Sequence, residues 1–114
     1  MTVISKPTGR GDFLLHAGAD ERLGVRWERD RRDGAGFRPV DLTGWRATLR
    51  LECDGEAAFS AACTTTSDGY AWGDVTAADT AALASAAPSG SWRITATDGT
   101  TTDVLGWGYY EIEG

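Results

Sequence analysis

The sequence predicts one all-β domain, an antiparallel β-sandwich of about seven or eight strands with one short helix. Apolar and polar residues alternate with a period of two along most of the chain, and a sustained helical period is hard to find. Turn signals recur about every 8–12 residues, the spacing of a small sandwich. With 114 residues the chain has the size of a single domain. We expect residues 1–10 to form an N-terminal arm and residues 11–114 the sandwich.

The first third of the chain predicts two strands and a loop. Residues 12–17 and 22–28 alternate in polarity, and the apolar residues of the second segment share one face. Residues 29–36 are charged and rich in glycine, which is typical of an exposed loop.

The middle of the chain predicts a hairpin. In residues 45–53 every odd position is apolar, and the same odd phase returns in residues 57–63 beyond an Asp54-Gly55 turn signal. A pairing in which the two residue numbers add to an even total therefore brings both apolar sets to one face. Cys53 and Cys63 share this phase, so we expect both to be reduced and at least partly buried. They lie too far apart along the hairpin for a disulfide.

The remaining elements follow in order. Residues 70–76 predict a short strand, and residues 76–85 a helix that Thr76 caps with Asp79 in the capping-box position. Residues 92–96 alternate again before an Asp98-Gly99 turn. The last strand spans residues 102–113, and its glycines at positions 106 and 108 indicate a bulge or a close backbone approach.

The distribution of charge restricts the partners. Residues 1–50 carry ten Lys or Arg against seven Asp or Glu, and residues 51–114 carry one, Arg93, against ten. The resulting balance of +3 and -9 argues against nucleic acid, which requires a concentrated basic face. The sequence has no apolar run near the ~20 residues that cross a bilayer, and its start lacks a signal-peptide pattern, so we expect no membrane and folding in the cytosol.

We expect no enzymatic activity, cofactor, metal or small-molecule substrate. The standard nucleophile and nucleotide motifs are absent, and His16 has no nucleophile beside it. Two cysteines and one histidine cannot supply a four-ligand zinc site. The Arg10-Gly11-Asp12 tripeptide, which integrins read in other proteins, is interpreted as a chance occurrence.

Two groups of residues are candidates for a partner interface. Four of the five tryptophans are in phase with core residues, but Trp107 points opposite to Gly106, Gly108 and Ile112. Trp107 and Tyr109 are therefore the aromatic candidates. The second group is basic: Arg29, Arg31 and Arg32 could receive the acidic half of a neighbouring subunit, or they could be a solvated, internally paired loop.

The order of motifs resembles that of a known family. These motifs are residues 41–50 (DLTGWRATLR), an Ala/Thr-rich stretch ending at Leu83, residues 89–94 (SGSWRI), residues 98–99 (DG) and residues 104–110 (VLGWGYY). They are similar to the β-sandwich domain family of phage long-tail-fibre, baseplate and minor virion structural proteins, over about residues 11–113.

The resemblance implies an immunoglobulin-like, non-enzymatic adaptor in the virion of a tailed bacteriophage, assembled in the host cytoplasm in several copies. Its partners would be other virion proteins and copies of itself. A head decoration or minor capsid protein is an alternative. A carbohydrate- or host-surface-binding module would need two exposed, coplanar tryptophans, and a small hydrolase would need His16 near a carboxylate or hydroxyl in a pocket.

Overall fold

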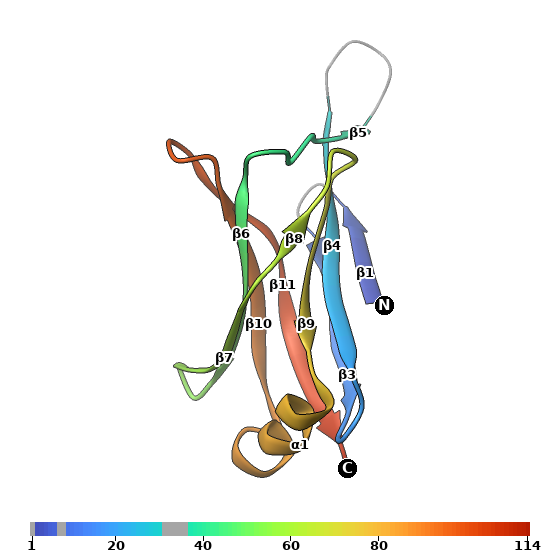
Figure 1. The fold of residues 1–114 in the computed structure, drawn as a ribbon, viewed down its shortest axis with the longest axis vertical. Coiled ribbons are helices and arrows are strands. Elements are labelled where there is room, and N and C mark those ends of the chain that lie inside the picture. Colours follow the sequence, from blue (N-terminus) through green and yellow to red (C-terminus); the bar gives the residue numbers. More distant parts are fainter. Residues whose placement is uncertain (1, 7–8, 31–36) are drawn as a thin grey trace.

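The computed structural model describes residues 2–6, 9–30 and 37–114, which form two facing β-sheets with a helix at one end of the sandwich (Figure 1). The predicted all-β sandwich with one short helix is confirmed. The described residues contain eleven strands rather than seven or eight, because several are only two to four residues long. In this part of the chain no helix has the length and apolar character that spanning a membrane requires.

The first sheet has the order β1-β4-β9-β8, with β5 paired to β4. Its strands are β1 (Thr2–Lys6), β4 (Glu21–Asp30), β5 (Phe37–Pro39), β8 (Thr64–Thr65) and β9 (Tyr70–Val75). The second sheet has the order β2-β11-β10-β6-β7, with β3 paired to β11. Its strands are β2 (Gly9–Arg10), β3 (Phe13–His16), β6 (Arg46–Cys53), β7 (Glu56–Ala62), β10 (Ser89–Thr97) and β11 (Thr102–Glu113).

Strands of the N-terminal segment pair with both sheets. Strand β1 pairs in parallel with β4 of the first sheet, and β2 pairs in parallel with β11 of the second. Strand β3 also runs parallel to β11, so the sandwich is not antiparallel throughout. Alternation along a strand specifies which side chains face the core, but it does not specify the direction of the neighbouring strand.

Two residues of the predicted loop at residues 29–36, Arg29 and Asp30, belong to a strand instead. Strand β4 continues through Arg29 and Asp30, which pair with Arg38 and Phe37 of β5. Residues 31–36, with Arg31 and Arg32, lie outside the described residues.

The predicted hairpin is present between β6 and β7. Asp54 and Gly55 have φ values of 53° and 80°, the left-handed conformations that a type I′ turn requires. Leu51 pairs with Phe59 in the expected even register, but a bulge beside this pair leaves Ala57 exposed rather than inward.

The core lies between the sheets and includes residues from almost every long strand. Leu49, Leu51 and Ile94 are fully buried, and the indole of Trp92 stacks on Phe13 with ring centroids 4.4 Å apart. Cys53 and Cys63 are half-buried, as predicted for both side chains, and no disulfide joins them in the structure.

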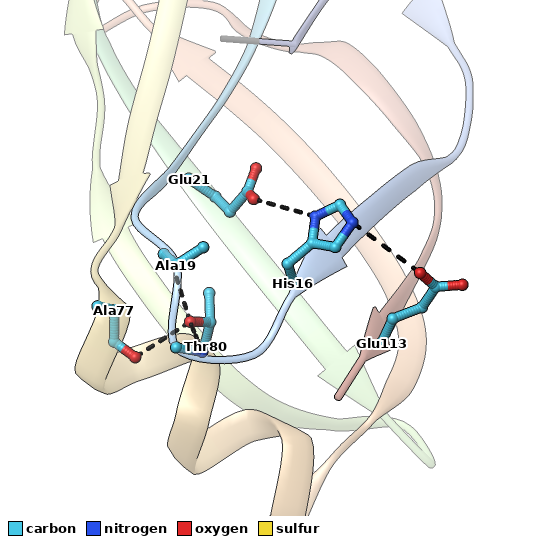
Figure 2. Close-up of polar contacts among 7 residues, drawn as sticks. His16, Ala19, Glu21, Ala77, Thr80 and Glu113 are labelled. Atoms are coloured by element: carbon cyan, nitrogen blue, oxygen red, sulfur yellow. Dashed lines mark hydrogen bonds and ion pairs between the residues drawn. The ribbon is translucent and has the colours of Figure 1, made fainter.

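Helix α1 (Ala77–Ala86) closes one end of the sandwich (Figure 1). The predicted capping box is present, because the Thr76 side chain accepts from the Asp79 N–H and the Asp79 carboxylate accepts from the Thr76 N–H. The buried hydroxyl of Thr80 lies 2.9 Å from the carbonyl oxygen of Ala19 and accepts from the Gly18 N–H at 3.0 Å (Figure 2). These bonds fasten the helix to the β3–β4 turn.

Leu49→Ala is expected to lower the free energy of unfolding by about 2–5 kcal/mol, the usual cost of truncating a buried leucine. The next residue, Arg50, is the matched control, since its side chain is 45% exposed and forms only a surface ion pair with Glu52. Arg50→Ala should therefore cost under about 1 kcal/mol. Denaturant titration measures both values, and equal losses would contradict the assignment of Leu49 to the core face.

Alkylation of Cys63 in the folded protein is expected to be at least about tenfold slower than in the unfolded chain at about pH 8. The reason is burial, which raises the pKa of the Cys63 thiol to about 12 and suppresses the reactive thiolate. Because the unfolded thiol ionises near pH 8.5, the contribution of Cys63 to stability should fall as the pH rises above that value. Timed alkylation with mass spectrometry tests this, and equal rates in the folded and unfolded states would refute it.

Candidate interaction surface

The exposed large hydrophobic side chains of the described residues gather on the outer face of the second sheet. Val104, Trp107 and Tyr109 of β11 are 39, 44 and 56% exposed, and Leu14 of β3 is 51% exposed. Leu14 pairs with Glu111 of β11, so the four side chains follow one another along adjacent strands. Single exposed hydrophobics are ordinary, but a concentration on one face is typical of an interaction surface. We call these four residues the β11 stripe.

The phase of β11 explains why the stripe is exposed. Gly108 and Tyr110 face the core, and the Tyr110 hydroxyl donates to the Ala87 carbonyl at 2.9 Å. Side chains of a strand alternate between faces, so Trp107 and Tyr109 must point outward. The structure thus exposes Trp107 on the side that the sequence predicted, and it exposes Tyr109 with it.

Arginine side chains frame the stripe. The Arg10 guanidinium lies 5.4 Å from the centroid of the Trp107 ring and 5.8 Å from that of Tyr109. On the other side, Arg93 of β10 pairs directly across from Trp107 and lies 3.4 Å from a carboxylate oxygen of Glu52. Exposed cation–π contacts each contribute about 0.5–1 kcal/mol, so Arg10 restrains the two rings modestly, while Arg93 adds charge beside them.

The stripe is anchored to the core through the Arg10-Gly11-Asp12 segment. The Gly11 N–H donates to the Trp107 carbonyl at 3.1 Å, and the Gly11 carbonyl accepts from the buried Trp92 indole N–H at 2.8 Å. The Asp12 carboxylate accepts from the Tyr109 N–H at 3.1 Å. This tripeptide therefore has a structural role that its sequence did not indicate.

Tyr109 stands between two shallow hollows of this surface. Arg50, Glu52, Arg93 and Trp107 contribute to one of them, and Asp12, Leu14 and Glu111 contribute to the other. The arrangement offers a protruding aromatic side chain with polar groups around it, the composition of a protein–protein contact.

Sequence reasoning missed Leu14 and Val104 of the stripe, and Arg10 beside it. Leu14 and Arg10 reach this surface because β3 and β2 pair in parallel with β11. The signal for Leu14 was its position between Phe13 and Leu15, which share the opposite phase. Arg10 carried no comparable signal, since its contact with Trp107 depends on a pairing that alternation does not encode.

The basic candidates do not join this surface in the described residues. Arg29 lies in β4 of the first sheet, where its backbone pairs with Arg38. Arg31 and Arg32 lie outside the described residues.

His16 lies between two carboxylates on the surface (Figure 2). Its Nδ1 atom is 3.6 Å from Glu21 and its Nε2 atom is 3.9 Å from Glu113, and the His16 side chain is 61% exposed. The carboxylates required by the hydrolase hypothesis are thus present, but the imidazole is open to water rather than enclosed. Among the described residues no group of three His, Cys, Asp or Glu is placed to hold a metal ion.

The tryptophans do not form the pair that the carbohydrate hypothesis requires. Trp27 and Trp92 are buried, Trp45 is half-buried against the core, and only Trp107 is largely exposed. Trp72 differs from the prediction, because it lies half-buried outside the core with the Arg22 guanidinium 5.3 Å from its ring centroid.

Comparison with known proteins identifies a shared fold. No protein-family profile and no curated protein sequence matches the chain. Among solved structures, the N-terminal domain of phage TP901-1 ORF48 is similar, with a TM-score of 0.60 and 10% sequence identity over 98% of this chain and 95% of that one. The two domains therefore have the same fold over nearly their whole lengths.

Gly108→Ala is expected to lower the free energy of unfolding by about 1–3 kcal/mol or more, because the new methyl group would overpack a filled site. A Cβ atom at this position would lie 1.6 Å from the Gly11 carbonyl oxygen and 2.8 Å from the Trp92 indole nitrogen. Ser91→Ala on the neighbouring strand is the control, with an expected change under about 0.5 kcal/mol. Denaturant titration followed by tryptophan fluorescence measures both. Parent-like stability of Gly108→Ala would contradict the close approach of Gly11.

Proposed function

We propose that this chain is a non-enzymatic structural component of a tailed-bacteriophage virion, and that the β11 stripe contacts neighbouring virion proteins. The observation that carries the proposal is the collection of Leu14, Val104, Trp107 and Tyr109 on one face. Support for the phage setting comes from the motif resemblance and from the similar fold of the phage TP901-1 ORF48 domain.

The chemistry of the stripe suits a specific protein contact. Tryptophan, tyrosine and arginine are the residues most enriched among those that dominate binding energy. Arg10 already orders both aromatic rings in the free domain, which reduces the entropy lost when a partner binds. The function is therefore assigned to an interface, with no cofactor or catalytic step.

Trp107→Ala and Tyr109→Ala are each expected to reduce incorporation into particles of the source phage by about tenfold or more, as for central interface residues. The loss should be nearly independent of salt, since hydrophobic burial is not a Coulomb interaction. Tyr70→Ala is the matched control. Tyr70 lies on the first sheet, away from the stripe, and its ring centroid is likewise close to an arginine, 5.2 Å from the Arg26 guanidinium. Quantitative mass spectrometry of purified particles measures incorporation.

Thermal unfolding of the isolated domains separates assembly from folding. The proposal requires that Trp107→Ala and Tyr109→Ala keep nearly the parent stability, because both side chains are largely exposed. If both variants assemble normally while their stability falls, the two residues serve the fold and the interface is elsewhere.

A further inference from the structure

Strand β7 lies beside β6 at one edge of the second sheet (Figure 1), at the opposite end of the strand order from β2. It pairs with β6 on one side, and on its other side no described strand pairs with it. An exposed edge presents unpaired N–H and C=O groups, to which another strand can hydrogen-bond.

The other sheet edges in the described residues carry features that oppose strand addition. Strand β8 has two residues, and β5 has three and includes Pro39. The edge formed by β2 and β3 is interrupted at Gly11, whose N–H already bonds to β11. Strand β1 ends at Lys6, directly before a proline. In contrast, β7 contains no proline, glycine or lysine, and beyond its bulge at Ala58 the four residues from Phe59 to Ala62 form a regular free edge.

The residues of β7 leave room for a second backbone. Apart from Glu56 at its start and Phe59, the strand consists of alanine and serine (EAAFSAA). Alanine has a low intrinsic preference for strands, so β7 depends on its pairing with β6 and gains from a partner on its free side. The bulge lies near the turn, and Phe59–Ala62 continue in regular register with β6.

We propose that β7 pairs antiparallel with β7 of a second copy of this chain, about a two-fold axis at Ser60. The core-facing sides of the two copies lie on the same side of the joined sheet only if the numbers of any two paired residues add to an even total. The register about Ser60 meets this condition. Phe59 lies opposite Ala61 of the second copy, and Ala58, the exposed residue of the bulge, lies beside its Ala62. The only charged residue of the strand, Glu56, lies outside the paired stretch, so no like charges face each other.

The composition of β7 favours a second copy over an unrelated strand. Every pair in this register joins a small side chain with another small side chain or with the half-buried Phe59. The self-pairing requires no segment from another protein and does not depend on the virion assignment. Ser60 itself faces its own symmetry mate, where two hydroxyl groups can hydrogen-bond across the axis.

A single-residue charge swap tests this register. Ser60 is exposed and faces Arg50 across the β6–β7 pair, so Ser60→Lys and Ser60→Glu should both fold. Each variant alone places two like charges directly opposite each other and is expected to self-associate at least about tenfold more weakly than the parent. An equimolar mixture of the two should associate again. Thr101→Lys, in the exposed turn before β11, is the control and should behave like the parent.

Sedimentation across a concentration series measures association, and circular dichroism confirms folding. If the Ser60 variants fail to fold, two double variants replace them. Ala58→Lys with Ala62→Glu places opposite charges beside each other across the axis, and Ala58→Lys with Ala62→Lys places like charges there. The first double variant should associate more strongly than the second. A parent chain that stays monomeric at every concentration overturns the proposal and leaves the edge to a strand of another protein. Self-association that Ser60→Lys does not weaken, or that the mixture does not restore, also overturns it, because another surface or register is then responsible.

Discussion

The hydrogen bond from the Trp92 indole to the Gly11 carbonyl connects the core of this protein to its surface. A buried indole N–H requires an acceptor, because leaving it unpaired costs about 1–3 kcal/mol. The acceptor here is a backbone carbonyl from the N-terminal segment, which can approach only because position 108 has no side chain. The same approach directs β3 along β11 and places Phe13 on the Trp92 ring. Arg10, one residue before Gly11, then reaches Trp107 and Tyr109.

Local patterns predicted the elements whose formation depends on nearby residues. The hairpin of β6 and β7 follows from two runs in the same phase around an Asp-Gly turn, and the helix follows from a Thr76 cap with Asp79. Strand β11 was predicted with its observed bounds, and its Gly106 and Gly108 do mark a bulge and a close approach. The bulge in β7 was not predictable, because a single inserted residue leaves the sequence pattern almost unchanged.

Pairings between distant segments could not be predicted in the same way. The parallel pairing of β2 and β3 with β11 joins residues about 97 positions apart, as in the bond between Tyr109 and Asp12. Alternation indicated that Trp107 is exposed, but it could not indicate which strand lies beside it. For that reason the sequence predicted the aromatic part of the candidate surface and missed Arg10. Trp72 shows the reverse case, in which a large apolar side chain lies outside the core with the Arg22 guanidinium over its ring.

The β11 stripe and the β7 edge belong to one sheet, so the two proposals together define a geometry. From β11 the order runs through β10 and β6 to β7, and two-fold pairing continues it into the second copy. The two stripes would then be separated by seven strand spacings, or about 34 Å at ~4.8 Å each. Neighbouring strands also rotate by roughly 20° in a constant sense, which accumulates to about 140° between the two β11 strands. Stripes that face nearly opposite directions cannot bind one partner at the same time, so such a dimer would connect two separate neighbours. A chain that joins its own copies along an edge and binds other proteins through its faces has the geometry of a bridging subunit.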